Sequence, residues 1–340
     1  MTKIEIAAAF REAFGPDRLR AGVPLAPMTT FRVGGSAEWL IETRNSGEVV
    51  EALGVANRLG VPVTILGGGS NVLVSDAGIR GLVIRPRGGD IAQTAPDQVR
   101  ADGAVTINGL VRWTINRGCA GLEAWAGTPG TVGGAVSGNA HFGGRLIGEL
   151  IDSVRVAARG GGVADVPSAE MEFRYDASRL QRTGEILLSA VFRVSRGDPA
   201  VLRAIARESL AFRKRTQPLD TPSAGCVFQN PDRTRGDAVP PGVPWSAGAL
   251  VDLAGLKGAR EGGARVSPTH GNFIVNDGTA TAADVRRLIE RCRSLVRERF
   301  GVELREEIVY LGELGDRDNS KSTETLPPES TPRTRRTNSG

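Results

Sequence analysis

The sequence predicts an α+β protein of two folded domains, and three observations support this fold class. The chain has 340 residues, which is enough for two or three domains at roughly 100–200 residues each. Between Phe31 and about Val194, short β-prone runs alternate with glycines and with segments of helical periodicity. The strongly periodic segment Val201–Lys214 then predicts a helix that opens a second domain.

The N-terminal half is expected to contain three helices and six strands. The helices are 1–20, Glu48–Leu59, which ends at Gly60, and Gly109–Asn116, which ends at Gly118. The strands are Ala37–Ile41, Val63–Leu66, Gly81–Arg85, Gln98–Asp102, Ile151–Ala157 and Glu185–Val194.

After the Val201–Lys214 helix, the pattern predicts turns, a sheet segment and a final helix and strand. These segments are the turn-rich Thr216–Pro244, the β-prone Ala264–Asn276, the helix Thr281–Phe300 and a strand around Glu303–Leu311. From Asp316 to Gly340 the sole large aliphatic residue is Leu326, among Ser, Thr, Pro and charged residues. Such a composition predicts a disordered tail.

Charge and cysteine content exclude several classes of function. Lys+Arg number 43 against 38 Asp+Glu, without a block of like charges, and aromatics make up 5%, so no nucleic-acid partner is expected. No apolar run reaches about 18 residues, so no membrane span is expected. Cys119, Cys226, Cys292, His141 and His270 have no metal-ligand spacing, so no metal site is predicted. The odd cysteine count and the absence of a signal peptide predict a cytoplasmic protein.

Two glycine-rich segments carry the strongest local signals. In the first, Gly67, Gly68 and Gly69 follow a β-prone run and precede Ser70 and Asn71. Residues without a Cβ let backbone N–H groups converge on phosphate oxygens, and the two polar side chains add donors. A simple hairpin turn explains the triplet equally well. The segment matches neither the GxGxxG fingerprint nor the P-loop.

The second segment, residues 121–148, holds nine glycines. Trp125, Val132, Val136 and Phe142 are interleaved with them, which is unlike a flexible linker. A packed loop that a flat or phosphorylated ligand approaches closely explains both features.

With further segments downstream, the chain resembles the UDP-N-acetylenolpyruvoylglucosamine reductases, flavoenzymes of peptidoglycan synthesis. Each matching segment is weak alone, but their order along the chain is specific. The segments are Thr30–Gly35, Leu66–Val74, Glu123–Ala135, Gln217–Pro218, Ser223–Pro231, Ser246–Asp252, Gly255–Gly258, His270–Asn276 and Leu304–Ile308.

The resemblance implies a domain organisation as well as a fold. An N-terminal helix, 1–19, precedes a two-lobed FAD-binding domain of the vanillyl-alcohol-oxidase (PCMH) type at 20–196. A smaller α+β substrate-binding domain follows at 197–315, and then the disordered tail, 316–340. No loop long enough for a large lid follows Ser178, so the chain resembles the compact second class of these enzymes.

The implied reaction is the NADPH-dependent reduction of UDP-N-acetylglucosamine enolpyruvate to UDP-N-acetylmuramate. NADPH reduces non-covalently bound FAD, and hydride then passes to the enolpyruvyl methylene. Negative charge left on the neighbouring carbon requires a cation or donor at the carboxylate and an acid for that carbon. The partner is a UDP-sugar, and the chain is expected to be a monomer.

The resemblance also assigns residues. Cys226 occupies the proton donor's position, where serine is usual, and Glu307 matches the catalytic glutamate. The alternatives are a small buried hydrophobic residue at Cys226 and a solvated carboxylate at Glu307. The FAD-binding positions are Gly67, Gly68, Gly69, Ser70, Asn71, Thr128, Pro129, Gly130, Gly134 and Asn139. The substrate-binding positions are Asn230, Lys214 and Lys257.

One departure from the family affects the chemistry directly. The family usually has Tyr-Arg-x-Ser, with an arginine that polarises the substrate, whereas this chain has Asp176 after Tyr175. A carboxylate opposes the developing negative charge, so either turnover is lost or another arginine substitutes. If the segment turns helically, Arg179 lies on the same face, and Arg174 does so less naturally.

A second departure shortens the loop after Asn139 and brings in His141 and Phe142, which either pack on the flavin or fill the loop. Two rival functions remain. An alcohol oxidase or dehydrogenase on the same FAD fold would lack the matches at Gly225–Pro231 and Leu304–Glu307. A flavin- or nucleotide-binding protein without turnover would fit Asp176, but it gives no reason to retain Glu307.

Overall fold

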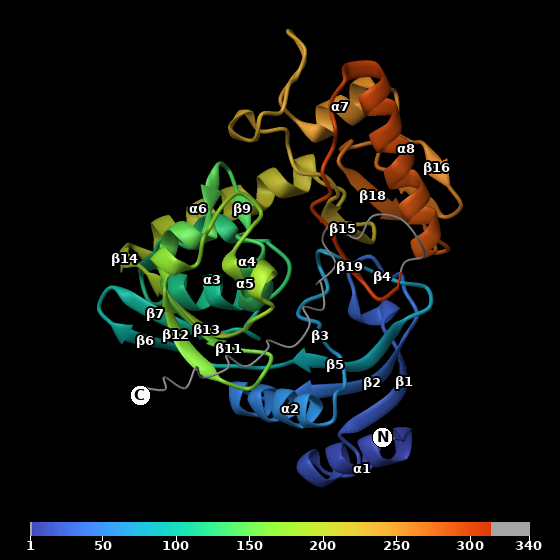
Figure 1. Cartoon of the computed structure of the whole chain (residues 1–340). Helices are drawn as coiled ribbons and strands as arrows, with labels where there is room; N and C mark the ends of the chain where they lie inside the picture. Colours follow the sequence, from blue (N-terminus) through green and yellow to red (C-terminus); the bar gives the residue numbers. More distant parts are fainter. Residues whose placement is uncertain (1, 314–340) are drawn as a thin grey trace, which may run out of the picture.

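Three bodies of secondary structure surround one central region of the molecule, two from the N-terminal half and one from the C-terminal part (Figure 1). The structure, a computed structural model, describes residues 2–313. The predicted disordered tail, 316–340, lies outside the described residues. Among residues 2–313, no helix has both the length and the apolar character needed to cross a membrane.

The first lobe is a four-stranded sheet in the order β1-β2-β5-β3, with helix α2 packed on it. Its elements are α1 (Lys3–Phe14), β1 (Leu19–Pro24), β2 (Ser36–Thr43), α2 (Ser46–Arg58), β3 (Val63–Ile65) and β5 (Ile79–Pro86). The predicted helix 1–20 therefore ends early, because Gly15 adopts a φ of 92° and β1 follows. Asn45 caps α2 by accepting a hydrogen bond from the Glu48 amide at 2.9 Å.

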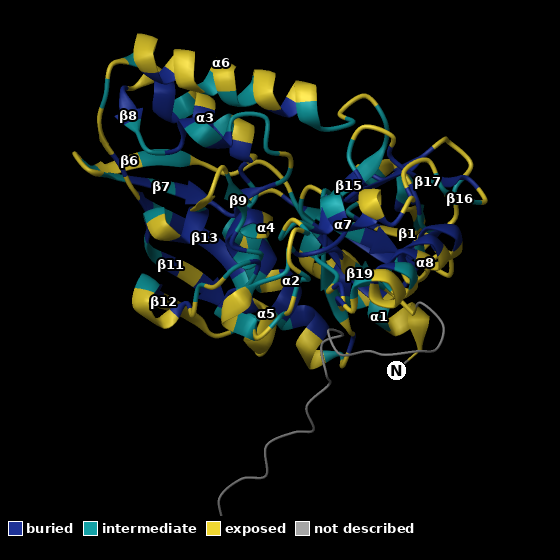
Figure 2. Cartoon of the chain, turned by 90° about the horizontal axis from the view of Figure 1, so that it is seen from above, coloured by how far each residue is buried: buried dark blue, intermediate teal, exposed yellow. Residues whose placement is uncertain are grey.

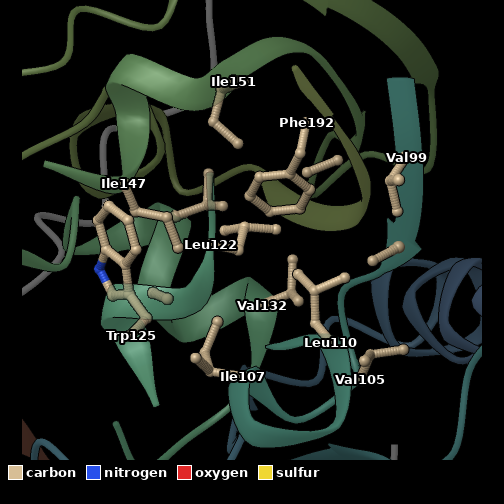
Figure 3. Close-up of a cluster of buried hydrophobic side chains, with 14 of the residues drawn as sticks. Val99, Val105, Ile107, Leu110, Leu122, Trp125, Val132, Ile147, Ile151 and Phe192 are labelled. Atoms are coloured by element: carbon tan, nitrogen blue, oxygen red, sulfur yellow. The ribbon is translucent and has the colours of Figure 1, made fainter. Parts of the chain in front are cut away.

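The second lobe is a five-stranded antiparallel sheet in the order β12-β11-β13-β7-β6. Its elements include β6 (Ile91–Ala95), β7 (Gln98–Asp102), α3 (Ile107–Asn116), β8 (Cys119–Ala120), α4 (Val132–Ser137), β9 (His141–Phe142), β10 (Arg145–Leu146), β11 (Ile151–Ala157), β12 (Val163–Pro167), α5 (Arg179–Thr183), β13 (Ile186–Arg193) and β14 (Ser195–Arg196). Trp125, Leu110 and Phe192 are part of the buried cluster between helices and sheet (Figure 3). The second glycine-rich segment is thus folded and packed.

Helix α6 (Pro199–Thr216) begins at the N-cap Asp198 and lies over the second lobe. Its Leu202 joins that lobe's buried cluster, while its outer face is exposed (Figure 2). The domain boundary predicted between residues 196 and 197 stays a prediction. The packing of α6 on the second lobe favours a domain boundary after this helix.

The third body is a four-stranded antiparallel sheet in the order β15-β18-β17-β16, flanked by two helices. Its elements are β15 (Ser223–Cys226), α7 (Ala247–Leu253), β16 (Arg260–Glu261), β17 (Ala264–Val266), β18 (Phe273–Asn276) and α8 (Ala282–Phe300). The α8 face with Val285, Leu288 and Cys292 is buried, as the periodicity predicts. The sequence predicted only turns over Thr216–Pro244, and strand β15, which pairs with β18, shows that this was wrong. A strand of four residues is too short to give a periodic signal.

A short parallel pair connects the first lobe with the end of the described chain. Strand β4 (Val72–Val74) follows the glycine triplet, and β19 (Val309–Leu311) pairs with it in the register Val309↔Val72. The Ser75 amide extends the pairing by donating to the Leu311 carbonyl at 2.8 Å. Residues far apart in the sequence therefore share one wall of the central region.

Candidate active site

A cleft of about 3800 Å³ lies between the three bodies. A site for one drug-sized ligand usually measures about 300–1,000 Å³, so this cleft has room for a dinucleotide and a second ligand. Both glycine-rich segments line it, together with residues from the turn after Phe173, from the end of α6, from β15 and from the segment that leads into β19.

The two glycine-rich segments meet in the cleft and leave no room for side chains between them. A Cβ on Gly68 would lie 2.5 Å from the Gly130 Cα, and one on Gly67 would lie 2.8 Å from the Thr131 Oγ1. The triplet joins β3 to β4, which belong to different sheets, so the hairpin alternative is excluded. Glycines at these two positions therefore allow the two segments to pack against each other at the cleft wall.

Two predicted cofactor residues have their amides engaged by the protein. Asn71 Nδ2 donates to the Glu307 carbonyl at 3.2 Å. Asn139 is fully buried, accepts from the Gly148 amide at 2.8 Å and donates to the Arg174 carbonyl at 2.7 Å. Both side chains thus fix the positions of neighbouring backbone segments.

Cys226 and Glu307 are brought together by backbone pairing at the cleft wall. Cys226 ends β15, and the Glu307 amide donates to the Val227 carbonyl at 2.8 Å. Burial, followed by the negative charges of Glu307 and Asp176, raises the pKa of the Cys226 thiol far above its ordinary value. The sulfur therefore carries a proton at neutral pH.

Asp176 lies in a tight turn that also faces the cleft. The Arg174 amide donates to the Ala177 carbonyl at 3.0 Å and the Ala177 amide donates back at 3.1 Å, while Asp176 adopts a φ of 53°. The Asp176 Oδ1 lies 3.0 Å from the His141 Nδ1, and the His141 Nε2 lies 3.3 Å from the Tyr175 hydroxyl. His141 therefore pairs with Asp176, an arrangement that neither sequence interpretation of the loop anticipates.

Arg179 was predicted to substitute for the missing arginine on the assumption that the segment from Asp176 is helical, and the turn contradicts that assumption. The segment is not helical at Asp176, since α5 begins at Arg179 itself. The Arg179 guanidinium makes two hydrogen bonds to the Glu185 carboxylate, at 2.8 and 2.9 Å, and does not line the cleft.

The three predicted substrate-binding residues also lie outside the cleft lining. Lys214 is exposed on α6, and Lys257 pairs with Asp252 at 2.6 Å. Asn230 accepts from the Ala247 amide at 2.9 Å and donates to the Tyr175 hydroxyl at 3.4 Å. Asn230 thus connects the start of α7 with the turn that carries Asp176.

The structure adds Arg213, a cleft residue that sequence reasoning missed. Its side chain is 6% exposed, donates to the Thr128 Oγ1 at 2.7 Å and stacks over Phe142 at 3.8 Å. Desolvation by burial lowers its pKa to about 10. Its Nε has no hydrogen-bond partner in the described part of the chain. A buried guanidinium without a carboxylate is a ready anion-binding group.

Comparison with known proteins supports this interpretation of the cleft. A family model described as an FAD binding domain matches residues 37–166, and a model of the C-terminal domain of UDP-N-acetylenolpyruvoylglucosamine reductase matches residues 217–311. The chain is 39% identical over 303 residues to the UDP-N-acetylenolpyruvoylglucosamine reductase of Synechococcus sp., covering 88% of this chain and 93% of the relative. It is 40% identical over 299 residues to reductase 2 of Symbiobacterium thermophilum, covering 87% and 93%. The crystal structure of the Thermus caldophilus reductase superposes with a TM-score of 0.72 and 32% identity, covering 86% of this chain and 99% of that one.

We predict that Gly68→Ala weakens FAD binding about tenfold or more, equivalent to about 1.4 kcal/mol, because its Cβ would push the Gly130 backbone away. Gly160→Ala is the matched control, since no heavy atom lies within 4 Å of its Cβ and its φ is not positive. Titration of flavin fluorescence measures both affinities. Equal affinities for the two variants would contradict this account of the cradle.

We also predict that Arg213→Met stabilises the FAD-free protein by about 1 kcal/mol or more, because a buried unpaired charge is removed. The difference in unfolding free energy between the variant and wild type should become smaller as the pH rises through 10. Above that pH the wild-type guanidinium loses its proton in the folded state before it does so in the unfolded state. Urea unfolding at several pH values measures this. Arg215→Met, an exposed position on the same helix, should change stability by no more than about 0.5 kcal/mol.

Proposed function

The chain belongs to the family of UDP-N-acetylenolpyruvoylglucosamine reductases, and from this premise we propose which of its residues carry out the reaction. It is an FAD-dependent oxidoreductase that reduces UDP-N-acetylglucosamine enolpyruvate to UDP-N-acetylmuramate with NADPH, a step in peptidoglycan precursor synthesis. Bound FAD supplies hydride transfer between NADPH and the enolpyruvyl group. The observation that carries the proposed residue roles is the adjacency of Cys226 and Glu307 in the cleft that both glycine-rich segments line.

The glycine-rich segments hold the FAD pyrophosphate. A Cβ on Gly68 would meet the Gly130 Cα at 2.5 Å, one on Gly67 the Thr131 Oγ1 at 2.8 Å, and one on Gly69 the Met28 carbonyl oxygen at 2.4 Å. A loop of such residues fits a group bound by backbone N–H donors. Ser70 and Thr128 add hydroxyls at the cleft wall. Asn71 and Asn139 act by positioning backbone, as their hydrogen bonds indicate.

Cys226 protonates the substrate carbon after hydride has arrived at its neighbour. The thiol keeps its proton at neutral pH because burial and the charges of Glu307 and Asp176 raise its pKa. The S–H bond breaks and a C–H bond forms, leaving a thiolate that Arg213 stabilises by its charge. Glu307 completes the polar wall from the segment before β19, whose backbone pairs with Val227.

Arg213 is a buried cation that lines the cleft, whereas Arg179 does not line it. Its guanidinium lies against Thr128 and Phe142 of the flavin segment and affects the pKa of Cys226. The Arg179 guanidinium is already neutralised by Glu185. A role for Lys214 or Lys257 at the substrate diphosphate requires their side chains to reorient toward the cleft.

The protein acts as a cytoplasmic monomer without a nucleic-acid partner. The three cysteines, Cys119, Cys226 and Cys292, are free thiols, which fits a reducing compartment. Light scattering of the FAD-loaded protein tests the oligomeric state directly.

An anaerobic half-reaction assay tests the function itself. NADPH should bleach the visible absorbance band of the bound flavin, and addition of the enolpyruvyl UDP-sugar should restore it with formation of the lactyl ether. A flavin that is bleached but never reoxidised by the substrate would favour the binding protein without turnover, which Asp176 alone suggests.

We predict that Cys226→Ala lowers the rate of the substrate half-reaction about 10²–10⁴-fold, because no group then carries the proton. Reduction of the flavin by NADPH should be unchanged. Cys226→Ser is the matched control, since a hydroxyl carries a proton at the same position, and it should retain most of the turnover. Stopped-flow absorbance separates the two half-reactions, and full activity of Cys226→Ala would exclude Cys226 as the donor.

A further inference from the structure

Three side chains from distant parts of the sequence converge where the family's arginine is replaced. Ligand atoms of His141, Asp176 and Glu307 all lie within 4.8 Å of one another. One imidazole and two carboxylates form a common ligand set for Zn²⁺ or Mn²⁺. They come from β9, from the tight turn and from the segment before β19, so their spacing along the chain gives no metal signature.

The hydrogen bonds around His141 follow the pattern found at metal sites. The Nδ1 lies 3.0 Å from the Asp176 Oδ1, so both atoms are close enough to bind one ion placed between them. The Nε2 lies 3.3 Å from the Tyr175 hydroxyl. A ligating histidine usually donates its second N–H to an oxygen in this way, which fixes the tautomer.

Asp176 supplies an independent indication of a missing ligand. Its side chain is more than nine-tenths buried, and its Oδ2 has no hydrogen-bond partner in the described part of the chain. Leaving a buried carboxylate oxygen without a partner is costly. The second carboxylate of the cluster, Glu307, lies within reach of the same ion.

We propose that His141 Nδ1, Asp176 and Glu307 bind one divalent transition-metal ion, Zn²⁺ or Mn²⁺. Three protein ligands leave coordination positions open. The next step rests on the proposed function: the substrate carboxylate binds at one open position. The ion then provides the positive charge that an arginine gives in the family. On binding, the imidazole proton moves from Nδ1 to Nε2, and the Nε2–H then donates a hydrogen bond to the Tyr175 hydroxyl.

Titration of the FAD-loaded protein with Mn²⁺, followed by electron paramagnetic resonance, tests the site without using activity. One ion per chain should bind, and Zn²⁺ should displace it. Asp176→Asn and His141→Gln should each weaken Mn²⁺ binding at least about tenfold, and Tyr175→Phe about 10–100-fold. His270→Gln, which changes the chain's other histidine, is the matched control and should bind like wild type.

Two results would overturn the site: no Mn²⁺ or Zn²⁺ binding at millimolar concentration, or binding that Asp176→Asn and His141→Gln leave unchanged. The role in turnover is tested separately by chelation. Chelator should abolish substrate reduction and added metal should restore it, while Asp176→Arg should turn over in the presence of chelator. Turnover that chelation does not change would overturn the role of the ion. Metal binding without turnover under any condition would contradict the proposed function and leave the site intact.

Discussion

The parallel pairing of β4 with β19 is the constraint on which the site depends. It connects the strand after the glycine triplet with the strand after Glu307, and Asn71 adds a side-chain hydrogen bond to the Glu307 carbonyl. Because Glu307 also pairs with Val227 through its backbone, Cys226 is held in the same arrangement. One set of main-chain hydrogen bonds therefore positions both the cofactor loop and the residues that act on the substrate.

The cleft contains buried side chains of both charges that are not fully paired within the described part of the chain. Arg213 enters from α6 without a carboxylate partner, and Asp176 enters from the tight turn with one oxygen unpartnered. Buried groups in this condition are stabilised when an oppositely charged ligand binds. Ligand binding therefore stabilises these buried charged groups. The same groups lie where the reaction forms an anion beside the substrate carboxylate.

Much of the fold was predictable, because β7, β11, α2 and α8 have clear periodicity and glycine punctuation. Short elements such as β4, α4 and α7 were not, since three to seven residues give too little pattern. In the site, the glycine-rich segments were recognisable in the sequence, because close backbone contact excludes a Cβ and so requires glycine at those positions. Arg213 was missed because it lies among basic neighbours on one helix, where only tertiary packing decides which side chain is buried. The pairing of His141 with Asp176 is equally invisible, since 34 intervening residues separate the two side chains that the turn brings together.

Hydrogen–deuterium exchange tests most directly whether the cofactor loop and the catalytic wall are one unit. The account predicts that FAD binding slows exchange in peptides from 303–313 as well as in those from 66–75, because the Val309 amide donates to the Asn71 carbonyl and β19 pairs with β4. Protection confined to 66–75, with 303–313 exchanging as in the FAD-free protein, would contradict it.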